Sequence, residues 1–281
     1  MDDLHSINEA INKRAGRKLI PSILVSATLV GLVWFTLAFQ RELFAVLIGI
    51  AVILGIREIA QAFDLSNTYI SFPALVIATV ILTVSTWRGG VAGLAIATAF
   101  CLPNLLVHLL RRGPQGFISN ATATTLVLIY LPFLAGFLIL LARPEDGLSR
   151  VMTFVILISC NDTFGYLVGM LFGKHPLAPL ISPKKSKEGL VGSLIFTVIG
   201  GSISFHYLLN ERWWIGAIVG LMVVFTATSG DLIESAMKRD LSLKDMGSLL
   251  PGHGGMLDRL DSALLSGPAV WLALEIVNRY L

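Results

Sequence analysis

Charged residues are scarce in this sequence. Asp, Glu, Lys and Arg make up 14% of its 281 residues, whereas hydrophobic residues make up 55%. An ordinary soluble domain is excluded, because about a quarter of the residues in such a domain are charged. Cysteine is scarce too. Cys101 and Cys160 lie in separate apolar segments without nearby metal-binding partners, so neither a disulfide framework nor a zinc site is expected. The class that remains is an integral membrane protein.

Apolar runs of membrane-spanning length account for most of the chain. A helix needs about 20 apolar residues to cross a bilayer core of roughly 30 Å. The sequence therefore predicts an all-α membrane protein with about nine transmembrane helices. Their expected ranges are Leu19–Phe39, Leu43–Ala62, Ile70–Thr86, Gly90–Leu110, Ala121–Leu141, Val151–Phe172, Gly189–Leu209, Trp213–Met237 and Ala263–Tyr280. We divide the chain into an N-terminal segment (1–18), about five N-terminal helices (19–142) and about four C-terminal, catalytic helices (143–281).

Basic residues are distributed unevenly between the two sides of this predicted bundle. With a cytoplasmic N-terminus, fourteen of the 21 Lys and Arg residues share the cytoplasmic side, six lie opposite, and Arg57 lies inside the second helix. The positive-inside rule supports this orientation in the cell membrane, with the C-terminus facing outward. Two long polar loops, 173–188 and 238–261, fall on the cytoplasmic side. We expect a polar catalytic cavity there.

The richest polar stretch runs from the end of the eighth expected helix to the start of the ninth. Helical spacing would place Asp231, Ser235, Lys238 and Arg239 near one face. Asp258 and Asp261 can likewise share a face. The residues that we single out in this stretch are Asp231, Ser235, Lys238, Arg239, Lys244, Asp245, His253, Gly254, Gly255, Asp258 and Asp261.

These residue types suit phosphate and metal chemistry. Asp231 together with Asp258 and Asp261 could hold Mg2+, which prefers oxygen ligands and is commonly shared with substrate phosphates. The glycines at 254 and 255 allow backbone amides to approach a phosphate closely. The plain alternative is a solvated loop. Asp231 argues against it, because a charge near the membrane interior costs about 2.5 to 3.5 kcal/mol, although snorkelling to the interface would reduce that cost.

A second polar group lies on the sixth expected helix and in the loop that follows it. Asp162 is buried by its position in an apolar run. Lys184, Lys185 and Ser186 form an anion site, because lysine is a flexible point charge suited to phosphate. The alternative is a basic collar that only fixes topology. In the second helix, Arg57 and Glu58 are neighbours that do not face each other, and each is expected to need a partner from another helix.

The polar stretch between the eighth and ninth expected helices resembles that of a known family. The stretch Ser235-x2-Lys238-Arg239-x4-Lys244-Asp245-x-Gly247-x3-Pro251-x-His253-Gly254-Gly255-x2-Asp258-Arg259-x-Asp261 resembles the signature of phosphatidate cytidylyltransferases (CDP-diacylglycerol synthases). The resemblance extends upstream to Asp162 and covers roughly the last 120 residues. One departure is Lys187, where the family often has an aromatic residue.

The resemblance implies a homodimeric membrane nucleotidyltransferase that joins CTP to phosphatidic acid and releases pyrophosphate. It implies Mg2+ on Asp231 and Asp258 with support from Asp261, and a monovalent cation such as K+ sharing the centre. It further implies that Ser235, Lys238, Arg239 and the lysines of the 182–189 loop hold substrate phosphates. A role for His253 as proton donor to the leaving group and a purely structural role are equally compatible with its position. No nucleic-acid partner is expected.

Two other functions remain open from the sequence. One is a related CTP-dependent membrane enzyme, a lipid kinase or cytidylyltransferase acting on a polyprenol or another lipid. The other is an ion-coupled secondary transporter, with Asp162, Asp231 and Arg57 on the ion path. Transporters of that kind often have paired halves with broken helices. Here the polar residues gather in one half, which favours an enzyme.

Overall fold

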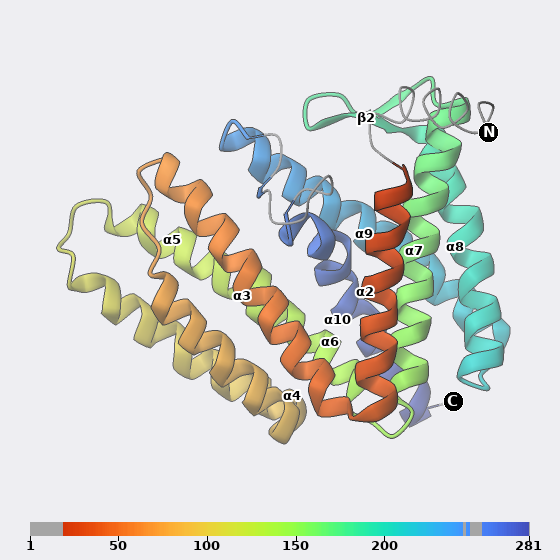
Figure 1. The fold of residues 1–281 in the computed structure, drawn as a ribbon, viewed down its shortest axis with the longest axis horizontal. Coiled ribbons are helices and arrows are strands. Elements are labelled where there is room, and N and C mark those ends of the chain that lie inside the picture. The colour runs from red at the N-terminus through yellow and green to blue at the C-terminus, as the bar shows by residue number, and fades with distance from the viewer. Residues whose placement is uncertain (1–18, 244–245, 248–254, 281) are drawn as a thin grey trace.

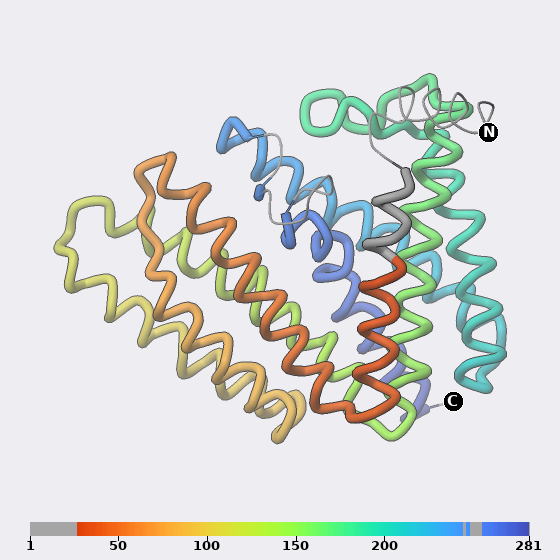
Figure 2. Tube along the Cα trace, in the orientation of Figure 1, coloured from red at the N-terminus to blue at the C-terminus, as the bar shows by residue number. Residues whose placement is uncertain are grey.

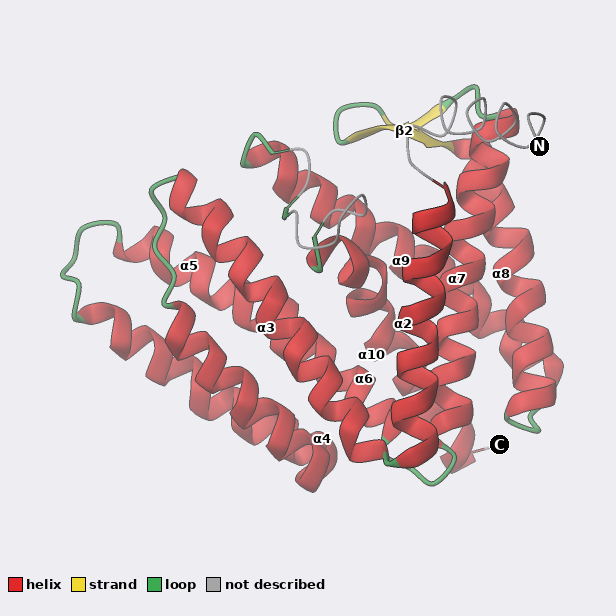
Figure 3. Cartoon of the chain, viewed as in Figure 1, coloured by secondary structure: helices red, strands yellow, loops and turns green. Residues whose placement is uncertain are grey.

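The structure is a computed structural model that describes residues 19–243, 246–247 and 255–280. Nearly all of this part is helical, and Figure 3 shows only one small β-hairpin among the helices. The elements are α2 (Leu19–Phe39), α3 (Arg41–Leu65), α4 (Phe72–Leu110), α5 (Phe117–Leu128), the π-helix η1 (Ile129–Phe133), α6 (Leu134–Ala142), α7 (Gly147–Phe172), β1 (Pro176–Ala178), β2 (Ser182–Ser186), α8 (Lys187–Leu208), α9 (Trp213–Asp240) and α10 (Leu257–Tyr280).

The expected all-α membrane architecture is confirmed. Within the described residues, seven helices are long and apolar enough to cross a membrane, when α4 is taken as one helix and α5 to α6 as another. Many large apolar side chains on their outer faces are exposed, among them Ile96, Phe100 and Leu171. Such a surface suits a hydrocarbon solvent, because lipid does not penalise exposed apolar groups as water does.

Helix α4 folds back on itself at Gly90, where φ is 61° and ψ is −141°. Glycine adopts such a conformation without steric cost. The two arms lie side by side, because the Ser71 hydroxyl is 3.2 Å from Nε2 of His108 and both arms line one apolar groove. Figure 2 shows the resulting hairpin. The arms correspond to the expected helices Ile70–Thr86 and Gly90–Leu110.

Arg143 holds the α4 turn. Its Nε donates to the carbonyl oxygen of Trp87 at 2.9 Å, and its Nη2 donates to that of Arg88 at 3.2 Å. Backbone groups left unpaired at a turn need partners, particularly in a membrane protein, where few alternatives exist. The turn of α4 and the β-hairpin lie at opposite ends of the molecule (Figure 1).

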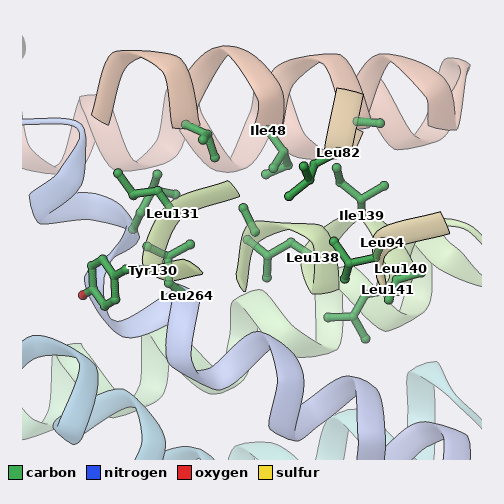
Figure 4. Packing of buried hydrophobic residues seen from close by; sticks show 14 of the residues in the cluster. Ile48, Leu82, Leu94, Tyr130, Leu131, Leu138, Ile139, Leu140, Leu141 and Leu264 are labelled. Carbon is green, nitrogen blue, oxygen red and sulfur yellow. The ribbon is translucent and has the colours of Figure 1, made fainter. Parts of the chain in front are cut away.

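The α5–η1–α6 segment is the centre of the molecule. It contacts α3, α4, α7 and α10, and 67% of its most apolar stretch is buried. Leu131, Leu138 and Ile139 pack there against Ile48 of α3 and Leu264 of α10 (Figure 4). The apolar core therefore joins the N-terminal helices to α10.

The C-terminal helices approach one another closely at small residues. A Cβ atom on Gly216 of α9 would lie 2.1 Å from the carbonyl oxygen of Gly201 in α8. A Cβ atom on Gly230 of α9 would lie 2.3 Å from the carbonyl oxygen of Asp261 in α10. Small residues let membrane helices pack backbone to backbone. The second contact brings the end of α9 to the start of α10, where the sequence predicted the site.

Candidate active site

Lys238 joins the two acidic stretches predicted from the sequence. Its Nζ donates to Oδ1 of Asp258 on α10 at 2.7 Å, and it also pairs with Glu234, one turn earlier on α9. The Glu234 side chain is completely buried, and its Oε1 has no hydrogen-bond partner in the described part of the chain. Glu234 was absent from the predicted site residues. The i, i+4 spacing to Lys238 was the available signal.

Asp231 and Asp261 lie on the facing sides of α9 and α10. The backbone contact at Gly230 sets this proximity, and the Asp231 carboxylate acts electrostatically on that of Asp261. The Ser235 hydroxyl lies 3.4 Å from Oδ1 of Asp231. Asp231 and Ser235 therefore lie on one face of α9, as their spacing predicted, and Lys238 points toward Asp258 on α10.

Asp162 of α7 extends the cluster. It accepts a hydrogen bond from Nδ2 of Asn161 at 2.9 Å and one from the hydroxyl of Ser262 on α10 at 3.3 Å. It also acts electrostatically on Asp261. Asp162 is exposed, not buried as its apolar surroundings in the sequence suggested. An accessible carboxylate on a helix of membrane-spanning length needs a polar neighbourhood, and Asp261 and Ser262 provide it.

The β-hairpin brings the second predicted group to the first. Lys185 of β2 forms an ion pair with Asp231, and Nε of Arg239 donates to the carbonyl oxygen of Ile181 at 3.3 Å. The Ser186 hydroxyl accepts from the backbone N–H of Gly189 at 3.0 Å and caps α8, whereas Lys184 is exposed. The two strands are three and five residues long and were not predicted.

Glu58 holds the start of α10 from a helix almost 200 residues away in sequence. Its Oε1 accepts the N–H of Met256 at 2.8 Å and its Oε2 accepts that of Leu257 at 2.9 Å. A carboxylate at this position satisfies helix N–H groups and the positive end of the helix dipole. The expected partner from another helix is confirmed for Glu58, whereas Arg57 is exposed.

Gly255, which lies just before α10, is packed closely against two of these acids. The Gly255 N–H donates to Oδ2 of Asp258 at 2.6 Å, and a Cβ atom on Gly255 would lie 2.4 Å from Oε2 of Glu58. The predicted site residues Lys244, Asp245, His253 and Gly254 lie outside the described residues.

The described residues contain no group of three or more His, Cys, Asp or Glu side chains placed to hold a metal ion. Instead, lysines neutralise two of the predicted ligands: Lys185 pairs with Asp231, and Lys238 pairs with Asp258. The cluster is nevertheless rich in carboxylate oxygens from α7, α9 and α10. It is a site where anionic and cationic side chains from distant segments meet at one end of a membrane bundle.

The fold and the site define a class of protein: a helical membrane protein with a charged site at one end of its bundle. Comparison with known proteins identifies the family. Residues 21–277 match the model of the cytidylyltransferase family. The chain is 36% identical over 280 residues to a phosphatidate cytidylyltransferase of Mycobacterium leprae, covering 94% of this chain and 90% of the relative.

Two further relatives agree. The phosphatidate cytidylyltransferase of Mycobacterium tuberculosis H37Rv is 35% identical over 94% of this chain and 84% of its own length. That of Staphylococcus haemolyticus is 37% identical over 140 residues, 50% of this chain and 54% of the relative. The chain therefore belongs to the cytidylyltransferase family. The predicted resemblance and the predicted enzyme class, a nucleotidyltransferase, are confirmed.

Proposed function

We propose that this protein transfers the cytidylyl group of CTP to phosphatidic acid, giving CDP-diacylglycerol and pyrophosphate for phospholipid synthesis. Two ion pairs carry the proposal: Lys185 with Asp231, and Lys238 with Asp258. They bring the two polar groups that the sequence predicted to bind phosphate into one site. The mycobacterial relatives, which are phosphatidate cytidylyltransferases and align over 94% of this chain, support the same reaction.

Mg2+ is the proposed cofactor, held by Asp231 and Asp258 with support from Asp261, and a monovalent cation such as K+ shares the centre. The donor set fits, because Mg2+ takes carboxylate oxygens and substrate phosphates as ligands. The buried Oε1 of Glu234, which has no hydrogen-bond partner among the described residues, is a further carboxylate oxygen beside these acids. Asp231 and Asp258 would hold the cation, and Lys185 and Lys238, which pair with these carboxylates in the structure, would then be available to phosphate.

The side chains of the cluster have to bring two anions together. A phosphate monoester is already anionic at neutral pH, so its oxygen attacks the α-phosphorus of CTP without a dedicated base. That P–O bond forms as the bond to the β-phosphate bridging oxygen breaks, and pyrophosphate leaves. Lys185, Lys238 and Arg239 supply fixed positive charge where negative charge develops. The bound metal would supply further neutralisation of the phosphates. His253 is a candidate proton donor to pyrophosphate.

The proposed arrangement in the membrane has nine crossings. Counting the two arms of α4 separately and adding α2, of 21 residues, to the seven candidate spans supports this number. The proposal includes a cytoplasmic N-terminus, a polar cavity open to the cytoplasm in the C-terminal helices 143–281, and a homodimer in the cell membrane. Cysteine labelling of engineered loop positions from either side of the membrane tests the orientation.

The proposed reaction predicts a lipid-soluble cytidine product. Purified protein with Mg2+, radiolabelled CTP and phosphatidic acid should form it, and Asp258→Ala should reduce the rate by at least about 10²- to 10³-fold, as loss of one electrostatic contact commonly does. Asp64→Asn, on the exposed end of α3, is the matched control and should remain active. Product from a polyprenol but not from phosphatidic acid would refute the substrate. Gradient-driven ion flux without any cytidine product would instead indicate a transporter.

A further inference from the structure

Tyr130 lies where the central helix loses its regular geometry. Residues Ile129–Phe133 form a single π-helical turn between α5 and α6, and Pro132 lies inside it. Proline lacks the N–H that a regular helix needs and collides with the preceding turn. Such π-turns shift the register of the residues that follow and are frequent at functional sites. Tyr130 is the second residue of this irregular turn.

The hydroxyl of Tyr130 is buried and unpartnered. The residue is 4% exposed, and its Oη has no hydrogen-bond partner in the described part of the chain. Its ring joins the apolar core, but the hydroxyl points away from the neighbouring Leu131 and Leu138 (Figure 4). Buried tyrosine hydroxyls usually find a partner, so this one calls for an explanation.

The charged groups that act on this hydroxyl are acidic. Asp261 acts on it electrostatically most strongly, followed by Glu234 and Asp231. Glu234 also carries an unpartnered, buried oxygen. A neutral phenol is a hydrogen-bond donor, and carboxylates are acceptors. A donor on the central helix that has no partner among the described residues therefore lies within electrostatic range of carboxylates on α9 and α10.

We infer that Tyr130 is a positioning residue of the cation site, whose hydroxyl donates a hydrogen bond to the Asp261 carboxylate when a divalent cation binds the cluster. This inference rests on the cation site of the proposed function. In the structure, Lys238 pairs with both Glu234 and Asp258. With a cation held by these carboxylates, the phenol would fix the orientation of Asp261 and weaken its repulsion with Asp231.

Cation binding to the purified protein tests the inference without reference to turnover. Mn2+ serves as a probe for Mg2+ and is titrated by electron paramagnetic resonance against wild type and Tyr130→Phe. The variant removes one oxygen and keeps the ring. The dissociation constant for Mn2+ should rise about tenfold, as expected when one hydrogen bond to a charged group is lost. The thermal midpoint of the cation-free protein should stay equal or increase, because a buried, unpartnered hydroxyl is removed.

The matched control is Thr86→Val. Thr86 is also completely buried with an unpartnered hydroxyl, but it lies beside the α4 turn, at the other end of the molecule. The Thr86→Val protein should bind Mn2+ with the same affinity as wild type. A double variant of Tyr130→Phe with Asp261→Asn provides the second measurement: if Tyr130 acts through Asp261, its loss should have little further effect in the Asp261→Asn background.

The outcomes separate this inference from the proposed reaction. In assays of turnover, Tyr130→Phe should need about tenfold more Mg2+ for half-maximal rate, with kcat at saturating Mg2+ within about twofold of wild type. An unchanged Mn2+ affinity in Tyr130→Phe, or no Mn2+ binding by wild type, overturns the inference. Wild type that binds Mn2+ but makes no CDP-diacylglycerol overturns the reaction alone.

Discussion

Replacing Glu58 should damage the active site from a distance. In the structure its two oxygens accept the N–H groups of Met256 and Leu257 at 2.8 and 2.9 Å, and the residue is 4% exposed. Glu58→Ala removes both acceptors and leaves two helix N–H groups without partners. Glu58→Gln keeps one acceptor but turns an NH2 group toward the second N–H. The alanine variant should therefore be the worse of the two.

The magnitude follows from these two bonds. A hydrogen bond to a charged group contributes about 1.5 to 3 kcal/mol, and losing one partner exposes the full desolvation cost of the other. For Glu58→Ala we expect a loss of stability of about 3 to 5 kcal/mol, and for Glu58→Gln about 2 to 3 kcal/mol. Asp258 is the second residue of α10, so displacement of the helix start also displaces a proposed metal ligand. A shift of about 1 Å can reduce turnover by about 10²-fold.

The assay combines thermal unfolding in detergent with cytidylyl transfer at saturating substrates. Glu42→Gln is the control, because Glu42 lies on the same helix α3 but is exposed, and it should change stability by less than about 0.5 kcal/mol. Wild-type stability and turnover in Glu58→Ala would refute the reasoning. So would an equal loss in Glu58→Ala and Glu42→Gln, because the effect would then belong to α3 as a whole.

Two further substitutions test other contacts. Lys185→Ala removes the cation paired with Asp231 and should raise KM for CTP about tenfold, the effect of losing one charged contact of about 1.4 kcal/mol. Lys185→Arg keeps the positive charge and should restore most of the affinity. An unchanged KM in Lys185→Ala would exclude a role for Lys185 in binding phosphate. Gly216→Ala places a Cβ atom 2.1 Å from the carbonyl oxygen of Gly201 and should destabilise the protein by about 1 to 3 kcal/mol in thermal unfolding, whereas Gly31→Ala, with no atom within 4 Å of the added Cβ, should not.

The sequence predicted the helices well because the bilayer fixes their length. The Arg88-Gly89-Gly90 break correctly separated two helices, and the structure turns at Gly90 with φ of 61°. The expected helix Ala121–Leu141 was continuous, whereas the structure divides it at the π-turn Ile129–Phe133. Hydropathy cannot register that division, because every residue of the turn is apolar or aromatic. Pro132 lies inside the turn and lacks the N–H that a regular helix needs, so it interrupts the local hydrogen-bond pattern.

Charge patterns along the sequence located much of the candidate site. Lys185, Lys238, Asp231 and Asp258 were predicted, and the structure joins them in two ion pairs. Periodicity succeeds here because α9 carries its charges at helical spacing. Periodicity alone could not predict which carboxylate each lysine would pair with, because the pairing depends on the distance between α9 and α10. The backbone contact at Gly230 sets that distance.

Glu234 on α9 was missed, and two further residues absent from the predicted site, Glu58 and Tyr130, come from the N-terminal half. Glu58 and Tyr130 lie within apolar helices, and their partners or electrostatic neighbours lie more than 100 residues further along the chain. A buried polar group in a membrane helix must satisfy its hydrogen bonds within the protein. An acidic residue such as Glu58 therefore predicts a hydrogen-bond donor from another part of the chain, even though the sequence does not show which residue supplies it. The N-terminal helices thus do more than anchor the protein. They contribute the carboxylate that fixes the start of α10 and a phenol within electrostatic range of the acids on α9 and α10, so a C-terminal fragment carrying the whole signature would lack both.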